Sequence, residues 1–483
     1  MNNSVGKDAL KLTIMKIITL IILMLSSMLL SRFRSLDEYG TYSQINIVVT
    51  LAISIFAMGF PKSINYFLAS ADTKDEKTKF LSTYFTFNTI LSFITGIVLI
   101  IAIPFMSKYF NNFYISKFIF VLFLLPWINI INSSFDNFLI VEKRTSLLMI
   151  YRIARGIVTL FLIIVTYKLN WNFVLYMKCF IISEVIFTVI IYLIVTKLSN
   201  TVLIGMDYSL IKKILKFSLP LGLATIVGTL NIEADKLMVG YFFDTKTLAI
   251  YTNAAKEMPV TIIASSITAV LMPQIVRLLK FKKENDVIDL WGNATYLSYV
   301  FICFFSTALF VFAPQVMSFL YSDKYLPGVG VFRLYSLLLL LRTTYFGMIL
   351  NCLGETKIIF YSSILTLMLN IILNLILFNL FGINGFAIAS ILSVCFVNIL
   401  QLKITSNILN IRFKNVMPWH KILNISIINL LFGIIFYLIT KKINLEYFVG
   451  NIIEMIILGT VWLFLYLILL YKSIKNTWNI LNR

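Results

Sequence analysis

The chain has 483 residues, of which 60% are hydrophobic and 13% are charged, and 41 Lys and Arg against 21 Asp and Glu give a net charge of +20. Its mean hydropathy is +0.92. A soluble domain is about half apolar and a quarter charged, so this composition excludes a soluble enzyme and equally a disordered chain. What remains is a polytopic membrane protein, in which basic loops fix orientation and nucleic acid is not expected as a partner.

A helix needs about 20 apolar residues to cross the hydrocarbon core of a bilayer. By this criterion the sequence predicts an all-α fold with about fourteen transmembrane helices. In chain order the predicted spans are 10–31, 44–70, 80–105, 118–141, 147–168, 172–196, 214–242, 248–275, 290–313, 331–353, 358–380, 385–405, 422–440 and 450–471. Gly59 with Pro61, and Pro259, mark candidate kinks within these spans.

The basic residues predict how these spans are oriented. If both termini are cytoplasmic, 26 Lys and Arg fall in cytoplasmic segments and nine fall in outer segments. An excess of this kind is the positive-inside pattern of membrane proteins. We therefore expect a multi-pass protein whose N- and C-termini are both cytoplasmic.

The sequence pattern indicates two related halves followed by a C-terminal tail. Superposing Tyr42 on Tyr251 places the seventh predicted helix over the first. Parallel repeats of six helices predict a substrate site in a central cavity between two bundles. The expected organisation is an N-terminal lobe over 1–205, a C-terminal lobe over 206–410 and two additional helices over 411–483.

Dispersed motifs give the chain a family resemblance. They are Arg32 to Tyr42 (RFRSLDEYGTY), Leu215 to Leu221 (LKFSLPL) followed by Asp235 to Gly240 (DKLMVG), Leu248 to Pro259, Gly354 to Lys357 (GETK), Asn370 with Asn374, and Phe381 to Ser390 (FGINGFAIAS). In order and spacing they resemble the polysaccharide-exporter (Wzx-type flippase) family of the multidrug/oligosaccharidyl-lipid/polysaccharide exporter superfamily. Arg34-Ser35 stands where that family has a Leu-Gly step.

The resemblance implies two six-helix lobes around a V-shaped cavity, with an extra C-terminal helix pair. It implies a flippase of the bacterial plasma (inner) membrane that moves an undecaprenyl-pyrophosphate-linked oligosaccharide to the outer leaflet by alternating access. The expected partners are the lipid-linked oligosaccharide, the phospholipid bilayer, and a polysaccharide polymerase with other assembly proteins. We expect a monomer, with no cofactor.

Ionisable residues inside predicted spans are the candidate site, because each costs about 2.5–3.5 kcal/mol to insert. Helix seven carries Asp235 and Lys236, and helix eight carries Lys256 and Glu257. A short loop makes these helices antiparallel, so the charges are expected at one level. They either form interhelical ion pairs, with Glu233 and Lys236 paired along the helix, or line an aqueous cavity. Asp235 and Glu257 could then bind a coupling ion, H⁺ or Na⁺.

Three further cations, Arg155, Lys178 and Arg342, are predicted deep in their spans, with Arg342 at the midplane. They either line the cavity, where a guanidinium suits pyrophosphate, or pair with a mid-span acid such as Glu184, itself a candidate for ion coupling.

Cations are also predicted at the ends of spans. Arg32 and Arg34, at the outer end of helix one, would receive the headgroup or act as interfacial anchors. Lys62 lines the inner entrance or snorkels to the interface.

Catalytic templates are absent from the sequence. It contains no Walker loop, no nucleotide fingerprint and no metal-ligand spacing, so no catalytic residues and no metal are expected. Alternatives of the same superfamily are a lipid II flippase and a multidrug or cation antiporter. A polytopic polysaccharide polymerase or glycosyltransferase would need a large outer loop, whereas the longest predicted here surrounds Asp323 to Tyr325.

Overall fold

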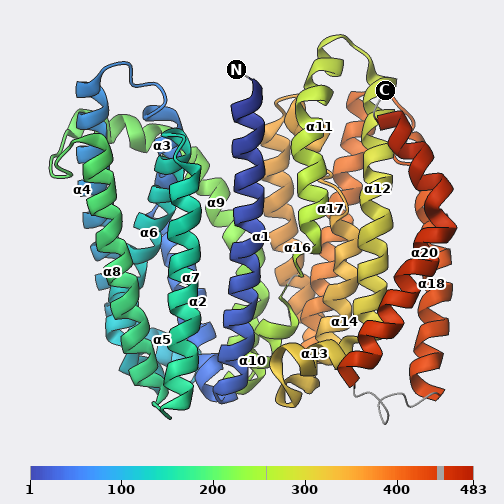
Figure 1. The fold of residues 1–483 in the computed structure, drawn as a ribbon, viewed down its shortest axis with the longest axis horizontal. Helices are drawn as coiled ribbons and strands as arrows, with labels where there is room; N and C mark the ends of the chain where they lie inside the picture. The colour runs from blue at the N-terminus through green and yellow to red at the C-terminus, as the bar shows by residue number, and fades with distance from the viewer. Residues whose placement is uncertain (1, 257, 443–450, 482–483) are drawn as a thin grey trace. The chain divides into compact units, whose positions relative to one another are not determined.

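The structure is a computed structural model that describes residues 2–256, 258–442 and 451–481, and all regular elements in that part of the chain are helices (Figure 1). Twelve of these described helices are long and apolar enough to cross a membrane. The predicted all-α polytopic fold is therefore confirmed, while the count of about fourteen spans and the orientation of the termini stay predictions. The chain divides into two compact units, Met1–Ala249 and Ile250–Arg483, and the predicted lobe boundaries stay predictions.

The first unit is a bundle of long helices with short helical connections. Its helices are α1 (Asn2–Phe33), α2 (Leu36–Phe56), α3 (Phe60–Phe67), α4 (Lys74–Ile101), α5 (Ile103–Tyr109), η1 (Phe113–Phe118), α6 (Ile119–Val141), α7 (Thr145–Lys168), α8 (Phe173–Ser199), α9 (Tyr208–Phe242) and the start of α10 (Thr245–Ala254).

Polar caps set where the helices of the first unit begin. Ser35 starts α2 by accepting a hydrogen bond from the Glu38 amide at 3.2 Å, and the Glu38 carboxylate accepts from the Ser35 amide at 3.0 Å. Thr73 and Glu76 form the same capping box before α4. Such boxes satisfy the orphan amides at a helix N-terminus.

Aromatic side chains fill the core of the first unit. A buried cluster joins α3, α4 and α6 to α7, α8 and α9. Its almost fully buried aromatic members include Phe60, Tyr84, Phe135 and Phe138. The core therefore holds the start of α7 and the end of α8 together with α6, and these three helices carry the polar site described below.

The second unit contains the remaining helices. They are η2 (Pro259–Thr261), α11 (Ile262–Lys280), α12 (Glu284–Val311), α13 (Ala313–Tyr321), η3 (Asp323–Gly328), α14 (Val329–Leu338), η4 (Leu339–Arg342), α15 (Met348–Cys352), α16 (Thr356–Phe381), α17 (Ile383–Ile408), η5 (Phe413–Asn415), α18 (Trp419–Lys442) and α20 (Asn451–Leu481).

The C-terminal helices α18 and α20 pack on α12 within the second unit (Figure 1). Phe436 and Trp462 stack with ring centroids 5.1 Å apart. The Asn429 amide donates to the Cys303 carbonyl at 2.6 Å, and the Tyr466 hydroxyl donates to the Val300 carbonyl at 2.9 Å. Helix α12 is consequently the centre of this part of the unit.

Four of the predicted continuous spans are wrong in detail, because the helix is interrupted inside them. The observed interruptions lie between α2 and α3, at Ala102 between α4 and α5, between α10 and η2, and between η4 and α15. At the first of them Gly59 adopts φ +73°, a left-handed conformation that suits glycine. Backbone freed in this way is tolerated at depth only where it is buried in protein or lines a cavity.

Candidate functional site

A polar network crosses α6, α7 and α8 in the first unit. The Arg155 guanidinium donates from Nε to both oxygens of Glu184, at 3.0 and 2.7 Å, and its Nη2 lies 2.5 Å from Oε2. Its Nη1 donates to the Asn132 side-chain oxygen at 3.1 Å, which also accepts from the Tyr151 hydroxyl at 2.9 Å. The ion pair thus joins α7 to α8, and the hydrogen bonds to Asn132 join α6 to α7.

The exposed fractions of the two charged side chains differ. Glu184 is 2% exposed, whereas Arg155 is 28% exposed. A carboxylate buried this deeply within membrane helices needs a partner, and the fork of an arginine satisfies both of its oxygens. Of the two expectations for Arg155, the structure shows pairing with Glu184; whether either residue also takes part in substrate or ion binding stays a prediction.

A second ion pair lies beside the first on α6 and α7. Arg152 Nε donates to Asp136 at 3.0 Å, and its Nη2 contacts the other carboxylate oxygen. These side chains are more exposed, at 36% for Arg152 and 21% for Asp136. Asp136 follows Asn132 by one helical turn, and Arg152 precedes Arg155 by nearly one, so the two helices present matched polar faces.

Sequence reasoning missed the α6 half of this network. Arg152 is one of the 26 cations that the positive-inside pattern predicts in cytoplasmic segments, and the predicted site residues do not include Asn132, Asp136 or Tyr151. The available signal was the helical spacing of Asn132 with Asp136, and of Arg152 with Arg155, on successive predicted spans.

Arg34 is a buried tether at the end of α1. Its guanidinium donates to the Trp171 carbonyl at 2.8 Å and to the Thr166 hydroxyl at 3.1 Å. It also lies over the Tyr176 ring, 5.1 Å from the centroid. These contacts tie α1 to the α7–α8 connection, whereas neighbouring Arg32 is only half-buried.

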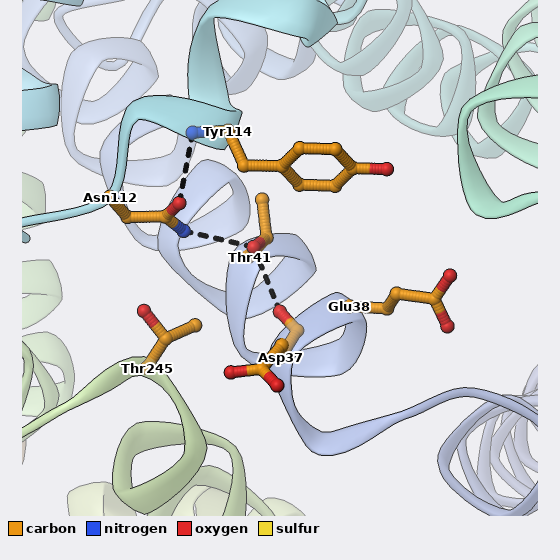
Figure 2. Close-up of a pocket in the computed structure, with 6 residues that line it drawn as sticks. All are labelled: Asp37, Glu38, Thr41, Asn112, Tyr114 and Thr245. Carbon is orange, nitrogen blue, oxygen red and sulfur yellow. Dashed lines mark hydrogen bonds between the residues drawn. The ribbon is translucent and has the colours of Figure 1, made fainter.

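The connections after α1, α5 and α9 meet at a small polar pocket of about 250 Å³ (Figure 2). Asn112 donates to the Thr41 hydroxyl at 2.9 Å and to Gln44 at 2.7 Å, and its side-chain oxygen accepts from the Tyr114 amide at 3.0 Å. Gln44 in turn donates to the Thr245 hydroxyl at 3.2 Å. Most of the polar groups around this pocket are therefore already engaged with one another, which makes it a structural junction.

The candidate charges of helix seven lie on α9. Lys236 donates to Glu233 at 3.0 Å, so the predicted pairing along the helix is present. Asp235 is buried, 4% exposed. Glu257 lies outside the described residues.

Lys256 and Arg342 do not lie inside continuous helices, contrary to prediction. Lys256 is exposed and follows the end of α10, in the interruption before η2. Arg342 is half-buried and ends η4, where the helix stops before α15. The Asn398 amide donates to the Leu341 carbonyl at 2.9 Å, and the Trp291 indole donates to the Thr344 hydroxyl at 2.9 Å. Neighbouring helices thus satisfy polar groups on both sides of Arg342.

The last two predicted cations are exposed. Lys178 lies near the start of α8, and Lys62 lies on the short helix α3. No group of three or more metal-binding side chains is found among the described residues.

Comparison with known proteins places the chain among glycan-related membrane proteins. A family model described as polysaccharide biosynthesis protein matches residues 29–330. The probable low-salt glycan biosynthesis flippase Agl15 of Haloferax volcanii is 21% identical over 258 residues, which are 53% of this chain and 53% of that protein. The chain therefore spans about half the length of the curated relative that it matches.

Solved structures share the fold. A lipid II flippase, MurJ, in an inward closed conformation matches with a TM-score of 0.75 and 16% identity over 95% of this chain and 99% of that one. An inward-facing multidrug resistance MATE family transporter of the MOP superfamily matches with a TM-score of 0.64 and 16% identity over 81% and 94%. A MOP superfamily transporter from Pyrococcus furiosus matches with a TM-score of 0.56 and 14% identity over 84% and 95%.

Proposed function

Because the chain belongs to the polysaccharide biosynthesis protein family, we propose that it is a flippase for a lipid-linked oligosaccharide. Its cargo is an undecaprenyl-pyrophosphate-linked repeat unit, moved from the cytoplasmic to the outer leaflet of the bacterial plasma membrane. The product supplies surface polysaccharide such as capsule, O-antigen or exopolysaccharide. The curated relative is a probable flippase, and the MurJ structure is that of a lipid II flippase.

The observation that carries this proposal is the polar network inside the helices of the first unit. Its charged and hydrogen-bonding side chains lie within spans that are otherwise apolar, and they are Arg155, Glu184, Asn132 and Tyr151. Intramembrane ionisable groups of this kind mark substrate or ion pathways. A polytopic polysaccharide polymerase or glycosyltransferase would instead need a large outer loop, and the described residues are mostly taken up by membrane-length helices and short connections.

Arg342 is the residue to which we assign the pyrophosphate. It ends η4 at a helix interruption, and interrupted helices commonly frame transporter substrate sites. The planar guanidinium can donate two parallel hydrogen bonds to phosphate oxygens, which a lysine cannot. Lys256, at the interruption between α10 and η2, supplies additional positive charge. The remaining cations add positive electrostatic potential along the path of the headgroup. They are Lys236, Arg155, Lys178, Arg32, Arg34 and Lys62.

Because the cytoplasmic side is electrically negative, the membrane potential favours outward movement of an anion by about 2.3 kcal/mol per charge per 100 mV. We propose that a coupling ion, or consumption of the product on the outer side, adds to this driving force. We assign the ion to Asp235 or Glu257, with Glu184 as a third candidate. Asp235→Asn and Glu257→Gln should each lower surface glycan; if neither changes it, this coupling assignment is wrong.

The experiment for the main proposal is genetic replacement in the native host. Loss of the gene should leave lipid-linked repeat units unpolymerised on the cytoplasmic leaflet, and the wild-type gene should restore surface polysaccharide. Arg342→Ala should abolish export at equal protein level, and Arg342→Lys should retain part of it. Equal phenotypes for the two variants would assign Arg342 a structural role, and normal polysaccharide in the deletion strain would refute the flippase proposal.

The MurJ-like fold also favours a second candidate, flipping of lipid II. The two functions differ in cargo and not in fold. Rescue of a strain depleted of its lipid II flippase would support this candidate, and rescue of surface polysaccharide alone would support the first.

A further inference from the structure

Two cavities in the second unit are both lined in part by the connection between α17 and α18. The first has a volume of about 550 Å³ and is walled mainly by apolar side chains of α12, η4, α17 and α18, among them Leu340, Ile399, Leu402 and Ile422. Volumes of this size are typical of sites that bind small ligands. Because the wall is so apolar, a hydrocarbon chain is the ligand that it suits.

The second cavity is also lined by residues of this connection and is polar. It has a volume of about 660 Å³ and is lined by Lys414, His420 and Lys421, with Asp289 as the one carboxylate among its described lining residues. Lys414, Met417 and Trp419 line both cavities. An apolar chamber and a basic chamber therefore meet at three shared side chains.

The basic chamber carries a net positive charge. Lys414 is exposed, and Lys421 donates to the Asn293 side chain at 3.3 Å while lying 5.4 Å from the centroid of the Tyr296 ring. Exposed Arg412 adds another cation on the same connection. The positive-inside pattern predicts that this connection is cytoplasmic, where the leaflet carries anionic lipids.

From this arrangement we propose that the two cavities bind one anionic phospholipid of the cytoplasmic leaflet. Its phosphate is held by Lys414 and Lys421, and one acyl chain occupies the apolar chamber. Basic pockets between transmembrane helices at the cytoplasmic side bind anionic headgroups in this way. The proposal goes beyond the flippase function and does not rest on it, because it requires only that the second unit lies in a bilayer.

The bound chain would lie against the helix interruption that follows η4. Thr343 and Phe346, in that interruption, line the apolar chamber together with Leu341. A chain in this chamber fills space beside backbone that is no longer packed as a regular helix, so bound lipid should stabilise the segment next to Arg342. The lipid would thus act as a structural cofactor of the second unit.

Native mass spectrometry of the purified full-length protein tests the headgroup. The probes are phosphatidylglycerol and phosphatidylcholine with identical acyl chains, added to detergent-solubilised protein. A contribution of about fivefold in affinity per lysine predicts that the K414Q/K421Q variant loses about 25-fold of its phosphatidylglycerol affinity. The matched control is K357Q/K403Q, which removes two exposed lysines that line neither cavity.

The acyl chain is tested by filling the apolar chamber. Cys395 lines it, whereas Leu392 is exposed on the same helix and lines neither cavity. Cys395→Phe should weaken phosphatidylglycerol binding while Leu392→Phe leaves it unchanged, and both variants should elute as folded monodisperse protein.

Three results would overturn the proposal. They are equal binding of the two phospholipids, equal losses in the K414Q/K421Q and control variants, and displacement of phosphatidylglycerol by an equimolar amount of undecaprenyl phosphate. The last result would assign the site to the transported lipid. Because none of these measurements involves export, they can fail while the flippase proposal stands.

Discussion

Breaking the Arg155–Glu184 ion pair should be among the most destabilising single changes in the first unit. Arg155→Met keeps an unbranched apolar side chain close to the aliphatic stem of arginine and removes the guanidinium. It eliminates the three contacts of 2.5 to 3.0 Å to Glu184, whose side chain is only 2% exposed. Removing one partner of a buried pair leaves an uncompensated charge and costs about 3–5 kcal/mol. Glu184→Gln should cost less, because a neutral amide still accepts from the guanidinium.

The assay is unfolding in mixed micelles, monitored by far-ultraviolet circular dichroism, which gives the free energy of unfolding of each variant. The double variant R155M/E184M should recover most of the loss, since replacing a buried pair by apolar side chains of similar volume is often neutral. Arg152→Met is the matched control, because Arg152 and Asp136 form a more exposed pair on neighbouring turns, whose loss should cost less than that of the Arg155–Glu184 pair. If R155M costs no more than R152M, or the double variant is no better than R155M, burial is not what makes the pair important.

Three further outcomes are expected. Gly40→Val should cost about 1–3 kcal/mol of stability by overpacking, because any Cβ at Gly40 overlaps the carbonyl oxygen of Thr245; Gly459→Val, with open space around it, is the control. Arg34→Lys should lower the thermal midpoint more than Lys168→Arg, because lysine cannot reproduce both hydrogen bonds of the buried guanidinium. The Lys79 ammonium lowers the pKa of Asp207, so the carboxylate contributes stability at neutral pH that is lost as pH falls through its folded pKa. The difference in thermal midpoint between wild type and Asp207→Asn should therefore shrink below about pH 4, and a constant difference from pH 3 to 7 would contradict this reasoning.

The fold class and the family could be predicted from the sequence because both rest on signals spread over the whole chain. Hydropathy located most of the helices, and the family resemblance drawn from dispersed motifs is confirmed. Two predicted spans, 10–31 and 214–242, are not among the twelve long apolar helices. The second corresponds to α9, where Glu233, Asp235 and Lys236 interrupt the apolar pattern.

The helix interruptions were predictable only where local chemistry marks them. Gly59 and Pro61 lie at the interruption between α2 and α3, and Pro259 follows the interruption after α10, so the sequence indicates both positions. The break after Arg342 has no such marker at its start. Its freed carbonyl at Leu341 is satisfied by Asn398, which lies far along the chain. A pairing of that kind depends on how α17 packs, which no local pattern contains.

The deep cations, treated as one group in the sequence, fall into two physical classes. Arg155, Lys236 and Arg34 make polar contacts to residues of their own unit, so a rearrangement of that unit as a rigid body leaves those contacts intact. Arg342 ends η4 and Lys256 follows α10, both at helix interruptions, where a small change in backbone angles moves a side chain far. Substitutions in the first class should therefore lower the amount of folded protein first, and should lower export per folded molecule less than substitutions in the second class do. Substitutions in the second class should lower export per folded molecule at normal protein level. Measuring surface polysaccharide and membrane-inserted protein together for Arg155→Met and Arg342→Ala separates these outcomes, and a common ratio for both variants would show that the two classes do not differ in function.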